Sequence, residues 1–114
     1  MAADVVVERA EHAHRVLLRG EVDLASAEGL ERAVLRETVG ARAVVLDLSG
    51  VSYLDSAGVR LLDHLARAFG RRRSPLRIVA PPGGQVRLVL RIVAYGEDLL
   101  DDDLAAAERA LARG

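Results

Sequence analysis

One short segment of this 114-residue chain carries residues that could do chemistry at the start of a helix: Asp55-Ser56-Ala57-Gly58. It follows an apolar run, Ala43–Leu48, and opens an amphipathic pattern. A helix N-terminus presents free N–H groups and the positive end of the helix dipole, so it favours an oxygen acceptor or a phosphate. Ser56 is therefore either a simple helix N-cap, the more common role for such a serine, or an exposed hydroxyl that can be phosphorylated.

A second polar segment lies earlier in the chain. The chain is expected to leave the sheet along Gly20–Asp23. Ser26 is expected to cap the helix that follows, and Glu28 is placed to interact favourably with the helix dipole. Loops at the ends of strands face solvent and can be recognised by a partner without disturbing the core. We therefore expect the turn around Asp23 and Ser26 to meet the start of the Ser56 helix at one edge of the sheet.

Other chemistries fit the residues less well. A serine hydrolase elbow needs Gly-x-Ser-x-Gly, and Leu54 stands where the first glycine should be. Asp47 at a strand end resembles the acceptor of a phosphorylated receiver, but that family uses a later lysine, which this chain lacks. His12 and His14 could share one strand face, yet a metal site needs three or four ligands, so a solvated loop is expected there. Arg71–Arg73 is interpreted as a hydrophilic loop.

The composition narrows the function further. All 16 basic residues are arginine, which excludes mechanisms that need an amine, and the net charge of −1 argues against direct binding of nucleic acid or an anionic membrane. Cysteine is absent, so disulfides and thiolate metal sites are excluded. No apolar run approaches the ~20 residues of a transmembrane helix. We expect one cytoplasmic domain over residues 1–114, monomeric rather than dimeric, with no cofactor or metal.

The hydrophobic pattern predicts an α/β fold. Strands are expected around Val5–Val7 and Val16–Leu18, joined as a hairpin. Helices and strands then alternate, with a strand at Ala43–Leu48 that is expected to be buried on both faces and a last short strand at Leu99–Leu100. The expected helix ends are Gly40, Gly70 and Gly96. Asp101–Asp103 precede a terminal helix and suit the dipole at its N-terminus, and Leu104, Ala107 and Leu111 of that helix can dock on the sheet.

The order of these elements resembles the STAS family over essentially the whole chain. The segments that carry the resemblance are GEVDLASA from Gly20 and LDLSGVSYLDSAG from Leu46, together with the PP-containing turn after Leu76. Within that family, the chain is most similar to stand-alone bacterial anti-sigma factor antagonists. The resemblance implies a mixed sheet of four or five strands, with about four helices mainly on one side, and no catalysis by this chain.

The resemblance also implies a switch. Family members bind a serine-kinase anti-sigma factor and so release a sigma factor; the kinase phosphorylates the serine of the D-S-[AS]-G turn, here Ser56, and a phosphatase restores it. On this basis the expected partner-binding residues are Asp23, Ser26, Asp55, Ser56, Ala57 and Gly58. Ala57 replaces a serine found in many members, which leaves Ser56 as the acceptor in the turn. Glu28-Gly29 departs from a common Pro-Glu, which predicts a looser start of the first helix. The alternative is a non-switching STAS accessory subunit of a lipid-transport or stress-sensing complex.

Overall fold

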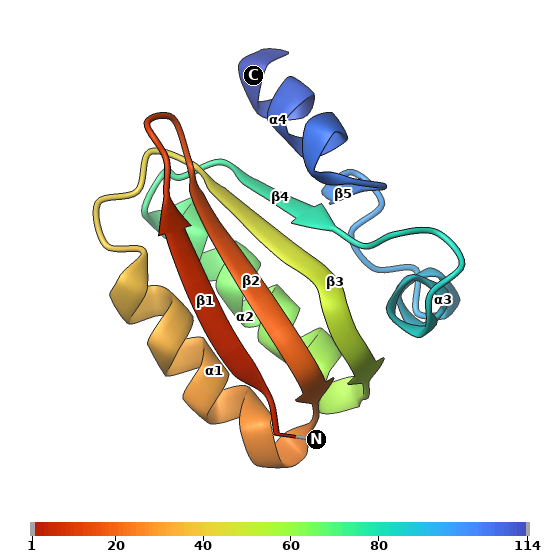
Figure 1. Ribbon diagram of the computed structural model, residues 1–114. Coiled ribbons are helices and arrows are strands. Elements are labelled where there is room, and N and C mark those ends of the chain that lie inside the picture. The colour runs from red at the N-terminus through yellow and green to blue at the C-terminus, as the bar shows by residue number, and fades with distance from the viewer. Residues whose placement is uncertain (1, 114) are drawn as a thin grey trace.

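The computed structural model describes residues 2–113, in which the apolar runs form one mixed sheet of five strands (Figure 1). The strands lie in chain order across the sheet: β1 (Asp4–Arg9), β2 (His14–Val22), β3 (Val44–Leu54), β4 (Leu76–Val79) and β5 (Leu100–Asp101). β1 and β2 pair as the expected antiparallel hairpin, and every later pairing is parallel. Parallel pairing places the ends of β2 and β3 at the same edge of the sheet.

Four helices cover this sheet: α1 (Leu24–Glu37), α2 (Ser56–Arg71), α3 (Gln85–Ile92) and α4 (Leu104–Arg113). Buried residues of α1, α2 and α3 join the main core with the strands, which confirms the prediction of helices mainly on one side. α4 lies on the other face, where Ala107 packs with Val45 and Val79 and is flanked by Leu104 and Leu111, as the sequence predicts. β3 therefore has both faces covered, and residues Val44–Leu48 are all buried.

Two strands are longer than predicted. β3 continues past Leu48 to Leu54, and β2 continues through Gly20 to Val22 instead of leaving the sheet at Gly20. The register of β2 against β3 shifts between Leu17 and Arg19 and again between Gly20 and Glu21, and at each shift the extra residue lies in β3. Gly20 has φ +92°, and a Cβ at this position would lie 2.5 Å from the Ala2 carbonyl oxygen. Glycine thus lets β2 continue where the sequence suggests a turn.

The helix ends also differ from the glycine positions used to predict them. α1 ends at Glu37, ahead of Gly40, and α3 ends at Ile92, well before Gly96. After α3, Ala94 takes the left-handed conformation (φ +53°), and the Tyr95 N–H donates to the Leu90 carbonyl at 2.9 Å. Tyr95 packs against the core, and this contact stabilises the end of α3 without the glycine that commonly ends a helix.

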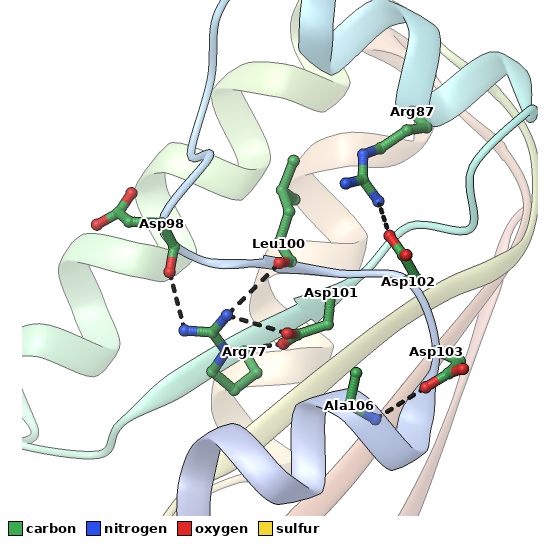
Figure 2. Close-up of polar contacts among 8 residues, drawn as sticks. All are labelled: Arg77, Arg87, Asp98, Leu100, Asp101, Asp102, Asp103 and Ala106. Carbon is green, nitrogen blue, oxygen red and sulfur yellow. Dashed lines mark hydrogen bonds and ion pairs between the residues drawn. The ribbon is translucent and has the colours of Figure 1, made fainter. Parts of the chain in front are cut away.

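The three consecutive aspartates before α4 have three different partners (Figure 2). Asp101 forms a two-point ion pair with Arg77 of β4, with Nε–Oδ2 at 2.7 Å and Nη2–Oδ1 at 3.1 Å. Asp102 pairs with Arg87 of α3 at 3.1 Å, and Asp103 accepts a backbone N–H of the first turn of α4 at 2.8 Å. Only Asp103 therefore interacts with the start of α4, as the sequence predicts. Asp101 instead joins β5 to β4, and Asp102 joins the segment after β5 to α3.

Candidate partner-binding site at the start of two helices

The two polar segments singled out in the sequence lie side by side. Val22 and Leu54 are paired residues at the ends of β2 and β3, and the next residue of each strand, Asp23 and Asp55, begins a helix. The Asp55 N–H donates to the Val22 carbonyl at 3.3 Å, so the two turns are joined by a backbone hydrogen bond. The expected convergence at one edge of the sheet is confirmed for these two strand ends.

Asp23, not Ser26, is the N-cap of α1, which corrects the prediction from the sequence. The Asp23 carboxylate accepts the Ser26 N–H at 3.1 Å, and the Ser26 hydroxyl oxygen accepts the Asp23 N–H at 3.0 Å. This reciprocal pair is a capping box with the usual residue types exchanged. The Ser26 hydroxyl also lies 3.0 Å from the Glu21 carbonyl oxygen, to which it can donate. The prediction of a loose start for α1 is therefore wrong, because the side chains of Asp23 and Ser26 each hydrogen-bond the other's backbone N–H and so fix the first turn.

Asp55, not Ser56, caps α2. Its Oδ1 accepts the N–H groups of Ala57 at 2.9 Å and Gly58 at 3.1 Å. Ser56 is consequently the first helical residue, and its side chain is exposed. Its hydroxyl forms no hydrogen bond with any residue in the described range 2–113. The simple capping role is thus taken by the neighbouring carboxylate, and the serine hydroxyl is left free at a helix N-terminus.

Ala57 and Gly58 are buried and shape the turn from beneath. A Cβ on Gly58 would lie 2.4 Å from Leu54 Cδ1 and 2.9 Å from the Val22 carbonyl oxygen, so only glycine lets α2 start this close to the sheet. Ala57 is 8% exposed and faces a groove between α1 and α2. These two residues hold Ser56 in place and offer little surface of their own.

The groove beside the site was not predicted from the sequence. It has a volume of about 320 Å³ and is lined by the first three turns of α1 and α2, with Ala57 at its floor and Arg60 and His64 on one wall. His64 contacts Glu31 of α1 at 2.9 Å across it. At its end, Leu24 is 78% exposed although it is apolar. The position of Leu24, directly after the capping residue Asp23, is the sequence signal that could have identified this exposed apolar side chain.

Other candidates are placed away from Ser56. None of the three histidines contacts the Ser56 hydroxyl within residues 2–113, and His12 is paired with Glu11 at 3.9 Å in the first turn. In the same range no group of three His, Asp or Glu side chains could hold a metal ion, and no helix is long and apolar enough to cross a membrane. Asp47 is buried and accepts the Ser49 N–H at 2.9 Å.

Most of the arginine run lies in a loop, as predicted: Arg72 and Arg73 are in the turn that follows α2. Arg71 is the last residue of α2, and Arg73 has φ +58° in the turn after it. Arg72 donates to the Leu35 carbonyl at 2.9 Å and to the Thr38 hydroxyl at 3.1 Å. The run thus joins the end of α2 to the end of α1.

Comparison with known proteins places the chain in a family. The family model described as "Mlab, STAS domain" matches residues 5–101, so this protein belongs to the STAS-domain family. An anti-sigma factor antagonist from Mycobacterium paratuberculosis has a similar structure, with a TM-score of 0.86 and 25% identity over 97% of this chain and 95% of that one.

Two further proteins are similar in fold or in part of the sequence. SpoIIAA of Bacillus, an anti-sigma factor antagonist, has the same fold in its unphosphorylated form, with a TM-score of 0.73 and 19% identity over 96% of this chain and 95% of that one. Osmosensory protein A of Mycobacterium tuberculosis is 41% identical over 58 residues. That match spans 48% of this chain and only 37% of the curated relative.

Proposed function

We propose that this chain is an anti-sigma factor antagonist that binds a serine-kinase anti-sigma factor, and that phosphorylation of Ser56 by this kinase switches binding off. The observation that carries the proposal is the state of Ser56: exposed, first in its helix and free of hydrogen bonds to the described residues, because Asp55 caps α2. The similarity to the mycobacterial antagonist over almost the whole chain supports it. The chain acts as a binding partner and not as an enzyme.

The proposed contact surface surrounds Ser56. It comprises four of the predicted residues, Asp23, Ser26, Asp55 and Ser56, to which we add Leu24, whereas the buried Ala57 and Gly58 shape it from beneath. Leu24 supplies exposed apolar area, and its burial against a partner would be favourable because it removes apolar surface from water. Asp23, Ser26 and Asp55 are half-buried and committed to caps, so they set the shape and negative charge of the surface more than they offer free hydrogen-bonding groups.

Phosphorylation would change this surface without refolding the domain. A phosphate at the first residue of α2 is favoured by the positive end of the helix dipole. It adds about −1.5 to −2 charges beside the Asp55 carboxylate, and the hydrated group must be desolvated when a partner docks. A penalty of about 3 kcal/mol from these effects weakens affinity on the order of 100-fold.

Phosphate mapping tests the proposal. The purified protein is incubated with ATP and a clarified extract of its native host, a phosphatase inhibitor is added, and modified peptides are identified by mass spectrometry. We expect phosphate on Ser56, its loss in Ser56→Ala, and its retention in the matched control Ser52→Ala, which alters an exposed serine four residues away. Labelling of Ser52 or Ser49, or none, would contradict the switch and favour the non-switching accessory subunit.

A further inference from the structure

The edge of β3 next to the site lacks a neighbouring strand. β2 pairs with β3 as far as Leu54, whereas β4 pairs only with Val44–Asp47. Beyond Asp47, the β3 edge that faces away from β2 is bordered by α3, not by a strand (Figure 1). Successive residues of a strand direct their N–H and C=O groups to alternate sides. Because Asp55 donates to Val22 of β2, the polar groups of Leu54 point to this open edge and need another partner.

Gln85, the first residue of α3, supplies that partner. Its Oε1 accepts the Leu54 N–H at 3.1 Å, and its Nε2 donates to the Leu54 carbonyl at 3.3 Å. One carboxamide thus exchanges both hydrogen bonds with one peptide residue, as a residue of a neighbouring strand would. The N-cap of α3, Gly84, provides no side-chain bond to its helix, and the Gln85 side chain reaches β3 instead.

We propose that Gln85 is a positioning residue that fixes the end of β3 and thereby sets Asp55 and Ser56 in the geometry a partner recognises. This inference rests on the proposed function only where it concerns the kinase. Asp55 is held by Val22 through its N–H and by the first turn of α2 through its carboxylate. Within residues 2–113, the hydrogen bonds of Leu54 on the open edge go to Gln85, so this side chain links α3 to the turn that carries Ser56.

The chemistry of the carboxamide permits a specific test. In Gln85→Ala both bonds to Leu54 are lost. In Gln85→Glu, the neutral acid can still accept one bond and donate the other, whereas the carboxylate can only accept and would face the Leu54 carbonyl. The glutamate variant should therefore behave like wild type in acid and like the alanine variant at neutral pH. A role in helix stability alone would give the opposite dependence, because the helix dipole favours a glutamate carboxylate over the neutral acid at the first residue of α3.

The measurement is amide hydrogen exchange of Leu54, Asp55 and Ser56 by NMR. Gln85→Ala should lower protection of Leu54 and Asp55 on the order of 10-fold, because the Leu54 N–H loses its acceptor and the end of β3 opens more often. Gln85→Glu should lose this protection between about pH 4 and pH 7, which spans the titration of a glutamate. Wild-type protein measured at each pH is the reference, because the neighbouring charged residues Asp55 and Arg87 are present in all the proteins and affect them equally.

Arg91→Ala is the matched control, since Arg91 is exposed on the same helix and forms no side-chain bond with residues 2–113. It should leave protection and labelling unchanged. Unchanged Leu54 protection in Gln85→Ala, or protection in Gln85→Glu that does not vary with pH, would overturn the inference.

The second readout is the rate of Ser56 phosphorylation from ATP in host extract, which should fall roughly 10-fold in Gln85→Ala through misplacement of the acceptor. Lower protection with an unchanged rate would overturn the link to Ser56 while the proposed function stands. If wild-type Ser56 is not phosphorylated, the proposed function fails, and the exchange data alone decide whether Gln85 positions the turn.

Discussion

The Asp55 carboxylate occupies the position that Ser56 would need in order to cap α2. Asp55 Oδ1 accepts the N–H groups of the second and third residues of the helix at 2.9 and 3.1 Å, and Ser56 stands between the capping residue and these two N–H donors, with its hydroxyl exposed. The capping residue and the candidate phosphorylation site are thus adjacent residues with different roles. This separation means that the serine can be modified without removing the group that starts the helix.

Replacing Asp55 with alanine should therefore destabilise the protein by about 1 kcal/mol, the usual cost of losing an N-cap. Asp55→Asn, which keeps an acceptor oxygen, should cost less. Both are measured as the free energy of unfolding in urea. Ser56→Ala is the control and should change stability by less than about 0.5 kcal/mol, as at an exposed position without contacts. A loss in Ser56→Ala equal to that in Asp55→Ala would show that the serine is the cap.

Gly58→Ala should destabilise the protein by about 1–3 kcal/mol, because the added methyl group overlaps Leu54 Cδ1 and the Val22 carbonyl oxygen. The chain contains two matched controls. Gly29 in α1 and Gly70 in α2 have nothing within 4 Å of an added Cβ, so alanine there should stabilise by about 0.5–1 kcal/mol. Thermal and urea unfolding of the three variants test this ordering, and equal effects at Gly58 and Gly70 would contradict the close contact.

The ion pair between Arg77 and Asp101 should contribute more than an exposed one. Its side chains are only 21% and 11% exposed, and Arg77 also donates to the Asp98 carbonyl at 2.8 Å (Figure 2). We expect Asp101→Asn to cost about 1–3 kcal/mol with little dependence on salt. Glu28→Gln, which breaks the exposed pair with Arg32, should cost no more than about 0.5 kcal/mol and less in high salt. Equal costs in urea unfolding would contradict this difference.

The sequence predicted what depends on local pattern. The hairpin, the buried run Val44–Leu48 and the docking of α4 through Ala107 follow from apolar periodicity, and all three are confirmed. The convergence of the two polar segments follows from parallel strands ending together. The identity of each cap could not be predicted, because aspartate and serine are equally good caps and the choice depends on where the preceding strand stops.

The parts that were missed depend on tertiary contacts. Gly20 is compatible with a strand or a turn, and only its approach to Ala2 and the continued pairing of β2 with β3 decide between them. Gln85 carries no signal in the sequence, since its role arises from β4 ending short of Leu54. Ala94, just after α3, has a conformation that normally favours glycine. This helix end is accompanied by packing of Tyr95 against the core, a tertiary contact that cannot be predicted from the local sequence.

The central claim concerns Ser56 and is tested most directly by calorimetric affinity for the isolated kinase partner, with Ser56→Ala and Ser56→Asp compared with wild type. A neutral side chain at this position leaves the surface around Leu24 and Asp55 intact, whereas a carboxylate places a second anion beside Asp55. We predict that Ser56→Ala binds like wild type, and that Ser56→Asp remains folded but binds much more weakly, by up to about 100-fold. Equal affinities for the alanine and aspartate variants, with both proteins folded, would contradict the switch.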